Sequence, residues 1–143
     1  MKNIVDTLID TGPLVAVLNR NDDYHRECAA IIQSLDCRFY ITLAVVTETM
    51  YLLHKRVGWI AQEALWRMIL RGDLILEHPS PAELVRMSEL MSKYSDRPMD
   101  FADASLVALA ERLSVDRIFT VDRRDFSTYR LHGKKPFTVI GPA

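Results

Sequence analysis

The sequence predicts a three-layer α/β/α sandwich built on a mainly parallel central sheet. Short runs rich in β-branched and aromatic residues alternate with longer segments of helical periodicity along the chain. This alternation is typical of units in which each strand is followed by a helix that packs on the sheet. No repeat, low-complexity tract or linker divides the 143 residues. We therefore expect one domain over residues 1–143.

The first strand, over residues 4–9, is an apolar run that ends at Asp10. Gly12 is expected to permit a tight turn after it. Pro13 sets the backbone φ for a first helical turn, which predicts a short helix over 14–18. Asp10 therefore lies at the carboxyl end of a strand, where parallel sheets place ligand sites.

The middle of the chain carries signals for the starts and ends of helices. Asp22 or Asp23 is placed to cap one helix, and Thr42 or Thr47 is placed to cap the next. Gly58 separates that helix from a third. We expect helices over 24–35, 46–57 and 60–70, and strands over 39–43 and 74–76.

The last part of the chain begins with a turn that contains two prolines. Ser80 is expected to cap the helix that follows, with Glu83 as its capping-box partner. Asp100 begins a second strongly helical segment. We expect helices over 82–94 and 101–113, and strands over 117–121 and 137–140.

Five acidic residues stand where the expected sheet presents the carboxyl ends of its strands. Asp10 follows the first strand, and Glu48 lies in the first turns of the helix after the second. Asp122 follows the fourth strand. Asp100 and Asp103 begin the helix after residue 99, where their spacing places them on one helical face. We therefore expect these side chains to converge although they are far apart in the sequence.

Carboxylates held close together raise one another's pKa values and cost stability. A hard divalent cation removes this cost, and Mg²⁺ or Mn²⁺ prefers oxygen ligands. Such a site supports metal-assisted hydrolysis of a phosphodiester bond. Each acid also has a simpler interpretation: Asp100 and Asp103 as the start of a helix, Glu48 as a surface residue and Asp122 as a turn residue.

The composition favours an ordinary soluble protein of the cytoplasm. Charged residues make up 26% and apolar residues 49% of the chain. No apolar run is long enough to span a membrane, and the first residues lack a signal peptide. Cys28 and Cys37 lack the spacing of a metal site, so free thiols are expected. The sequence contains no phosphate-binding glycine loop, serine nucleophile elbow or Cys-x-x-Cys motif.

The net charge is −1, but the charged side chains are unevenly distributed along the sequence. Residues 123–135 contain five basic side chains and one acidic side chain. A local basic patch on an acidic protein fits contact with a phosphate backbone, and a solvated surface is the simpler interpretation. Trp59 and Trp66 are interpreted as core or dimer-interface residues in preference to base-stacking residues.

Four segments together resemble the PIN-domain ribonucleases. In size and layout the chain is similar to the VapC-type toxins of type II toxin–antitoxin pairs. The segments are Leu8–Leu14, Val46–Thr49, Met99–Leu106 and Phe119–Phe126. Each segment is short, but all four in this order are specific, and they span nearly the whole chain.

The resemblance implies an endoribonuclease that depends on Mg²⁺ or Mn²⁺ and acts on structured RNA such as tRNA or rRNA. It also implies a homodimer and a small antitoxin protein that blocks the site. The acidic positions of the family fall on Asp10, Glu48, Asp103 and Asp122, which are the expected catalytic and metal-binding residues, and Asp100 is expected to join the metal site. Thr11 and Thr120 are expected to hold acids by hydrogen bonds, and Arg123 and Arg124 to contact phosphate.

Several alternatives remain open at this point. Within the family, the chain is a nuclease that processes RNA without being a toxin, or an inactive scaffold that binds RNA or a partner protein. Outside it, a phosphatase of the haloacid-dehalogenase type requires Asp-x-Asp after the first strand, whereas Asp10 is followed by Thr11 and Gly12. A receiver domain requires a late lysine that has no clear position in this sequence.

Overall fold

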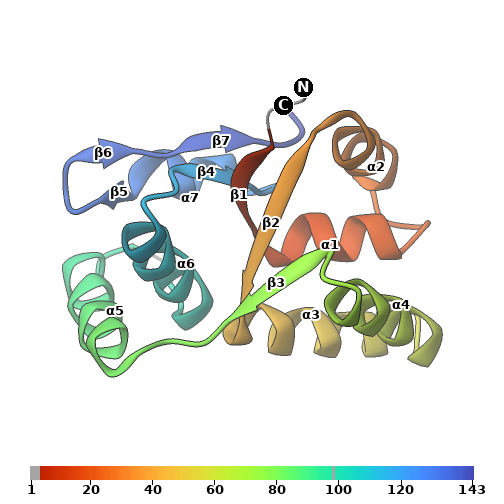
Figure 1. Cartoon of the computed structure of the whole chain (residues 1–143), viewed down its shortest axis with the longest axis horizontal. Helices are drawn as coiled ribbons and strands as arrows, with labels where there is room; N and C mark the ends of the chain where they lie inside the picture. The colour runs from red at the N-terminus through yellow and green to blue at the C-terminus, as the bar shows by residue number, and fades with distance from the viewer. Residues whose placement is uncertain (1–3, 98) are drawn as a thin grey trace.

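The computed structural model describes residues 4–97 and 99–143. These residues form a five-stranded parallel sheet in the order β3-β2-β1-β4-β7 (Figure 1). The strands are β1 (Val5–Ile9), β2 (Cys37–Thr42), β3 (Leu74–Glu77), β4 (Arg117–Phe119) and β7 (Thr138–Ile140). The predicted parallel sheet is confirmed.

Helices cover both faces of this sheet (Figure 1). One side carries α1 (Thr11–Leu18), α2 (His25–Ser34), α3 (Leu43–Arg56) and α4 (Trp59–Leu70), and the other carries α5 (Pro81–Lys93) and α6 (Phe101–Leu113). A further helix, α7 (Arg123–Thr128), packs beside β7, and β5 (Arg130–Leu131) pairs with β6 (Lys135–Pro136) as an antiparallel hairpin. The α/β/α arrangement is therefore confirmed.

Part of the core lies between the central strands and α6. Leu8 and Ile9 of β1 and Phe119 of β4 are fully buried. In α6, the side chains of residues 104–110 are all buried. Burial of one leucine or valine side chain stabilises the fold by about 2 kcal/mol. The helix that carries Asp103 is thus firmly anchored.

The order of the strands reverses between β1 and β4. From β1 the chain moves outward through β2 and β3 and then returns to the other side of β1 as β4. In open parallel sheets, the crevice outside the carboxyl ends of two such strands binds ligands. Asp10 directly follows β1 and Thr120 directly follows β4, so both residues stand at this crevice.

Some predicted boundaries differ from the structure. Helix α3 begins at Leu43, before the expected residue 46, because the Thr42 hydroxyl accepts the Val45 N–H at 3.2 Å. The predicted cap for α2 is wrong, because Asp22 accepts the backbone N–H of Tyr24 in the preceding turn and leaves the helix without a side-chain cap. Strand β4 ends at Phe119, before the expected residue 121. The sequence carried no expectation of α7 or of the β5–β6 hairpin.

Gly12 does not form the expected turn. Helix α1 already begins at Thr11, and a Cβ atom at position 12 would overlap Cγ2 of Val121. Glycine is needed here because α1 approaches the segment after β4 closely. This close approach keeps the residues that follow β1 beside those that follow β4.

Other predictions concern the ends and surfaces of helices. The capping boxes of Ser80 with Glu83 and of Asp100 with Asp103 are both present. Trp59 and Trp66 are 61% and 45% exposed, so they are not core residues. Over the described ranges, no helix combines the length and apolar character needed to cross a membrane.

Candidate active site

Asp10 is held at the crevice by hydrogen bonds to both carboxylate oxygens. Its Oδ1 accepts the Thr11 N–H at 2.8 Å, and its Oδ2 accepts the Thr120 hydroxyl at 3.0 Å. The Thr120 oxygen in turn accepts the N–H of Asp122 at 2.9 Å. Thr120 therefore links the residues that follow β1 to those that follow β4.

Asp100 and Asp103 bind each other at the start of α6. Asp100 Oδ1 accepts the Asp103 N–H at 2.8 Å, and Asp103 Oδ2 accepts the Asp100 N–H at 3.4 Å. The hydroxyl of Tyr129 donates to the same Asp103 Oδ2 at 3.1 Å. Asp100 is thus the cap that its position in the sequence suggested, and it also places its carboxylate beside Asp103.

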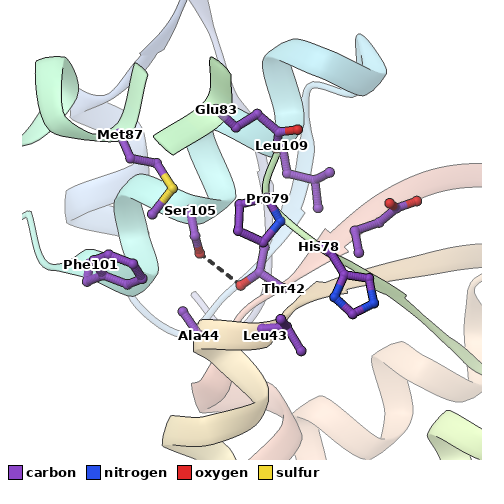
Figure 2. Close-up of a pocket in the computed structure, with 11 residues that line it drawn as sticks. Thr42, Leu43, Ala44, His78, Pro79, Glu83, Met87, Phe101, Ser105 and Leu109 are labelled. Carbon is purple, nitrogen blue, oxygen red and sulfur yellow. Dashed lines mark hydrogen bonds between the residues drawn. The ribbon is translucent and has the colours of Figure 1, made fainter. Parts of the chain in front are cut away.

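Glu48 reaches the site from the exposed face of α3. The start of α3 is tied to α6 by a hydrogen bond of 2.8 Å between the hydroxyls of Thr42 and Ser105 (Figure 2). Thr11 lies beside Glu48, and its hydroxyl accepts the buried hydroxyl of Thr49 at 3.4 Å. Three segments distant in sequence therefore meet at one place.

Burial and mutual repulsion raise the pKa values of these acids. Burial, together with the charges of Glu48 and Asp100, raises the pKa of Asp10 to about 6 against the hydrogen bonds from Thr11 and Thr120, which lower it. Burial, Asp100 and Asp10 raise the pKa of Asp103 to about 8. Burial and Asp100 likewise raise the pKa of Glu48. The site therefore gathers negative charge at a cost to stability.

The predicted acids fall into two groups. Asp10, Glu48, Asp100 and Asp103 interact directly, whereas Asp122 caps α7 and accepts the N–H of Asp125 at 3.4 Å. Burial, Asp122 and Asp100 raise the pKa of Asp125 to about 6. Asp122 is therefore joined to the other four acids through Thr120 and Asp125.

The oxygen atoms of these carboxylates are the kind of ligand that a divalent cation such as Mg²⁺ prefers. Within the described ranges, no lysine, arginine or histidine forms an ion pair with the four interacting acids. The same ranges contain no group of three or more His, Cys, Asp or Glu side chains arranged so that they could hold a metal ion. Binding a cation would thus require a rearrangement of at least some of these carboxylates.

The two arginines that were expected to contact phosphate differ in their surroundings. Arg123 donates to the backbone oxygens of Pro142 and Gly141, both at 2.8 Å. Arg124 lines an open hollow of about 470 Å³ together with Arg97, Asp125 and Tyr129. Arg123 thus holds residues 141–142 in place, and Arg124 is the better placed of the two for a ligand.

Two residues of the site were not expected from the sequence. Asp125 follows Asp122 at the spacing of a helix cap and its partner, a signal that would have predicted α7. Tyr129 has a weaker signal in its spacing of three residues from Phe126. Its contact with Asp103 depends on the path of the chain after β4, which no local pattern reveals.

Comparison with known proteins agrees with this geometry. A family model described as the PIN domain matches residues 7–130. Ribonuclease VapC26 of Mycobacterium tuberculosis is 35% identical to this chain over 133 residues, which make up 93% of this chain and 98% of that protein. The match to the PIN-domain model includes the whole span from Asp10 to Asp122.

Solved structures share the fold at lower sequence identity. VapC20 of Mycobacterium tuberculosis, described as a Sarcin-Ricin loop cleaving toxin, has a TM-score of 0.77 and 22% identity over 82% of this chain and 91% of that chain. A toxin–antitoxin complex from Klebsiella pneumoniae contains a chain with a TM-score of 0.62 and 22% identity, covering 85% of this chain and 91% of that one. The chain therefore belongs to the PIN-domain family, and its relatives within that family are VapC-type proteins.

Proposed function

We propose that this chain is an endoribonuclease that depends on Mg²⁺ or Mn²⁺ and serves as the toxin of a toxin–antitoxin pair. The observation that carries the proposal is the group of Asp10, Glu48, Asp100 and Asp103 at the crevice between β1 and β4. These carboxylates raise one another's pKa values, and a cation among them would remove that repulsion. The relationship to Ribonuclease VapC26 supports RNA as the substrate.

Each acid has a proposed role in hydrolysis. Asp10 and Asp103 would hold the cation, with Asp100 beside them. Glu48 is exposed and would orient the attacking water. Asp122 would complete the site from the segment after β4. A bound divalent cation supplies a Lewis acid that activates water and stabilises the negative charge that develops on the phosphate.

Basic residues beside the acids support contact with an RNA backbone. Arg124 and Arg97 line the same hollow as Tyr129, whose hydroxyl reaches Asp103. We propose that Arg124 binds a phosphate next to the one that is cleaved. A positively charged side chain near the site reduces the repulsion between the RNA backbone and the acidic side chains. A structured RNA such as tRNA or rRNA is the proposed substrate, and the cytoplasm is the proposed location.

Two exposed apolar surfaces support two protein partners. Tyr51 and Phe101 line an open hollow of about 570 Å³ together with Glu48 and Asp100. Phe101 also borders a more enclosed hollow of about 180 Å³ beside Leu43 and Met87 (Figure 2). Because this surface adjoins the acids, we propose that the antitoxin covers it and blocks the site.

The second surface lies on α4. Its exposed apolar side chains are Trp59, Ile60, Trp66 and Leu70. A surface of this kind is typical of an interface between proteins. We propose that a second copy of the chain covers it and forms a homodimer.

Substitutions on the two surfaces should separate the two associations. Ile60→Arg is expected to convert the dimer to a monomer, because a charge in the interface would have to be desolvated without a partner. Tyr51→Arg is expected to prevent binding of the antitoxin and leave the dimer intact. Light scattering of each variant, alone and with the purified antitoxin, measures both effects. A dimer that persists in Ile60→Arg, or an antitoxin complex that persists in Tyr51→Arg, contradicts the corresponding assignment.

Removal of divalent cations should abolish cleavage of RNA. Incubation of the purified protein with a labelled structured RNA is expected to yield specific fragments in Mn²⁺ or Mg²⁺ and none in excess EDTA. Readdition of Mn²⁺ is expected to restore them, because the cation would supply the Lewis acid that activates water. Cleavage that continues in EDTA contradicts the proposal, and a protein that binds no Mn²⁺ favours an inactive scaffold.

A further inference from the structure

Tyr129 is a buried side chain that packs among other aromatic rings. Its exposed fraction is 1%. Its ring lies edge-on to Tyr94, with 5.1 Å between the ring centroids, and to Phe126, with 5.2 Å between them. Phe126 in turn packs edge-on against Phe137 at 5.6 Å. Tyr94, which directly follows α5, and Phe126 of α7 therefore hold the ring, and Phe137 packs behind Phe126.

The backbone of Tyr129 is fixed as well. Its N–H donates to the carbonyl oxygen of Asp125 at 3.1 Å, which closes the last turn of α7. Phenylalanine would fill the same space with the same edge-on contacts. Packing alone thus accounts for the ring, and the hydroxyl needs a separate explanation.

The hydroxyl of Tyr129 reaches one oxygen of Asp103. It donates to Oδ2, and the N–H of Asp100 donates to the same oxygen. Among the described residues, the hydrogen bonds to the Asp103 carboxylate all go to Oδ2. Two donors on one oxygen fix the plane of the carboxylate, and Oδ1 is then the oxygen that faces away from both donors.

We infer that Tyr129 is a positioning residue, which orients Asp103 so that Oδ1 is presented to the divalent cation. This inference rests on the proposed function, because it takes Asp103 as a ligand. Partners that hold a ligating side chain in place raise the affinity for a metal by about 10- to 100-fold. Tyr129 would thus connect α7 and the aromatic cluster to the metal site without touching the cation.

Binding of Mn²⁺ to the purified protein tests this role without RNA. Tyr129→Phe removes the hydroxyl and keeps the ring, and it is expected to weaken Mn²⁺ binding by about 10-fold or more, measured by calorimetric titration. Tyr94→Phe is the matched control, because it removes a hydroxyl from the same aromatic cluster. The described residues contain no hydrogen bond between Tyr94 and Asp103, so this variant is expected to bind Mn²⁺ within about twofold of wild type.

A second arm shows whether the effect passes through Asp103. In the Asp103→Asn background, Tyr129→Phe is expected to cause no further loss of Mn²⁺ affinity, because the carboxylate that it orients is gone. Thermal unfolding in EDTA checks that both tyrosine variants remain folded and lose similar stability. A larger loss of stability in Tyr129→Phe with unchanged Mn²⁺ affinity would identify a purely structural hydroxyl.

The outcomes separate this inference from the proposed function. If wild type binds Mn²⁺ and Tyr129→Phe binds it equally well, the positioning role is overturned and the metal site stands. If wild type binds no Mn²⁺, the metal site is overturned and the positioning role with it. If Tyr129→Phe weakens Mn²⁺ binding in the wild-type background and causes no further loss in the Asp103→Asn background, both the metal site and the positioning role are supported.

Discussion

Asp10→Asn is expected to reduce RNA cleavage by on the order of 1,000-fold while the protein remains folded. Asparagine has nearly the same shape as aspartate but lacks its negative charge. The substitution therefore removes a charged ligand and with it several kcal/mol of stabilisation of the transition state. The rate of cleavage of a labelled RNA in saturating Mn²⁺, under single-turnover conditions, measures this loss.

Asp6→Asn provides the matched control for this experiment. Asp6 lies on β1, the strand that Asp10 directly follows, but its carboxylate is partly exposed and pairs with Arg38 at 3.6 Å. Because exposed pairs of this kind contribute little to stability, wild-type cleavage is expected from this variant. Retention of substantial activity by Asp10→Asn, with the circular dichroism spectrum of a folded protein, would remove Asp10 from the proposed site.

Asp103→Asn is expected to stabilise the metal-free protein at alkaline pH. The pKa of Asp103 is raised to about 8 in the folded protein, from an ordinary value of 3.8. The folded state therefore holds a proton that the unfolded state releases, so stability falls as pH rises from about 4 to about 8. Asparagine mimics the protonated carboxyl and avoids this loss. Because Asp103 is partly exposed, we expect a gain of only about 2 kcal/mol above pH 8.

Thermal unfolding in EDTA at several pH values measures this gain. The difference in melting temperature between Asp103→Asn and wild type is expected to be near zero at pH 4.5 and to reach roughly 6 °C above pH 8. Addition of Mn²⁺ should reverse the order, because the cation stabilises only a protein that binds it. A difference that does not change with pH would show that repulsion among the acids is not its cause.

The sequence predicted the fold well because the signals for it are local. Alternating apolar runs and helix caps marked most strands and helices, and the caps at Ser80 and Asp100 are present as expected. The acids could be placed at the sheet edge because each follows or begins an element with a clear signal. That reasoning needed only the rule that parallel strands present their carboxyl ends together.

Other features of the site depend on contacts that no local pattern encodes. Gly12 was expected to form a turn, but its lack of a side chain is explained by Val121, which lies far along the chain. The guanidinium of Arg123 donates to the backbone oxygens of Gly141 and Pro142, which the sequence did not predict. The partnership of Tyr129 with Asp103 also arises from tertiary packing. The sequence thus placed Thr11 and Thr120 beside the acids, and it missed Tyr129.

The hydrogen bond from Thr120 to Asp10 has a consequence for synthesis of the protein. It joins residues separated by 110 positions, and Thr120 is itself held by the carbonyl oxygen of Ile140 at 3.0 Å. During translation the amino-terminal part of a chain emerges first. A ribosome that has made β1 to α6 therefore carries a nascent chain in which Asp10 has no partner from β4. The hydrogen bond that holds Oδ2 of Asp10 therefore forms only after Thr120 has emerged from the ribosome, late in synthesis.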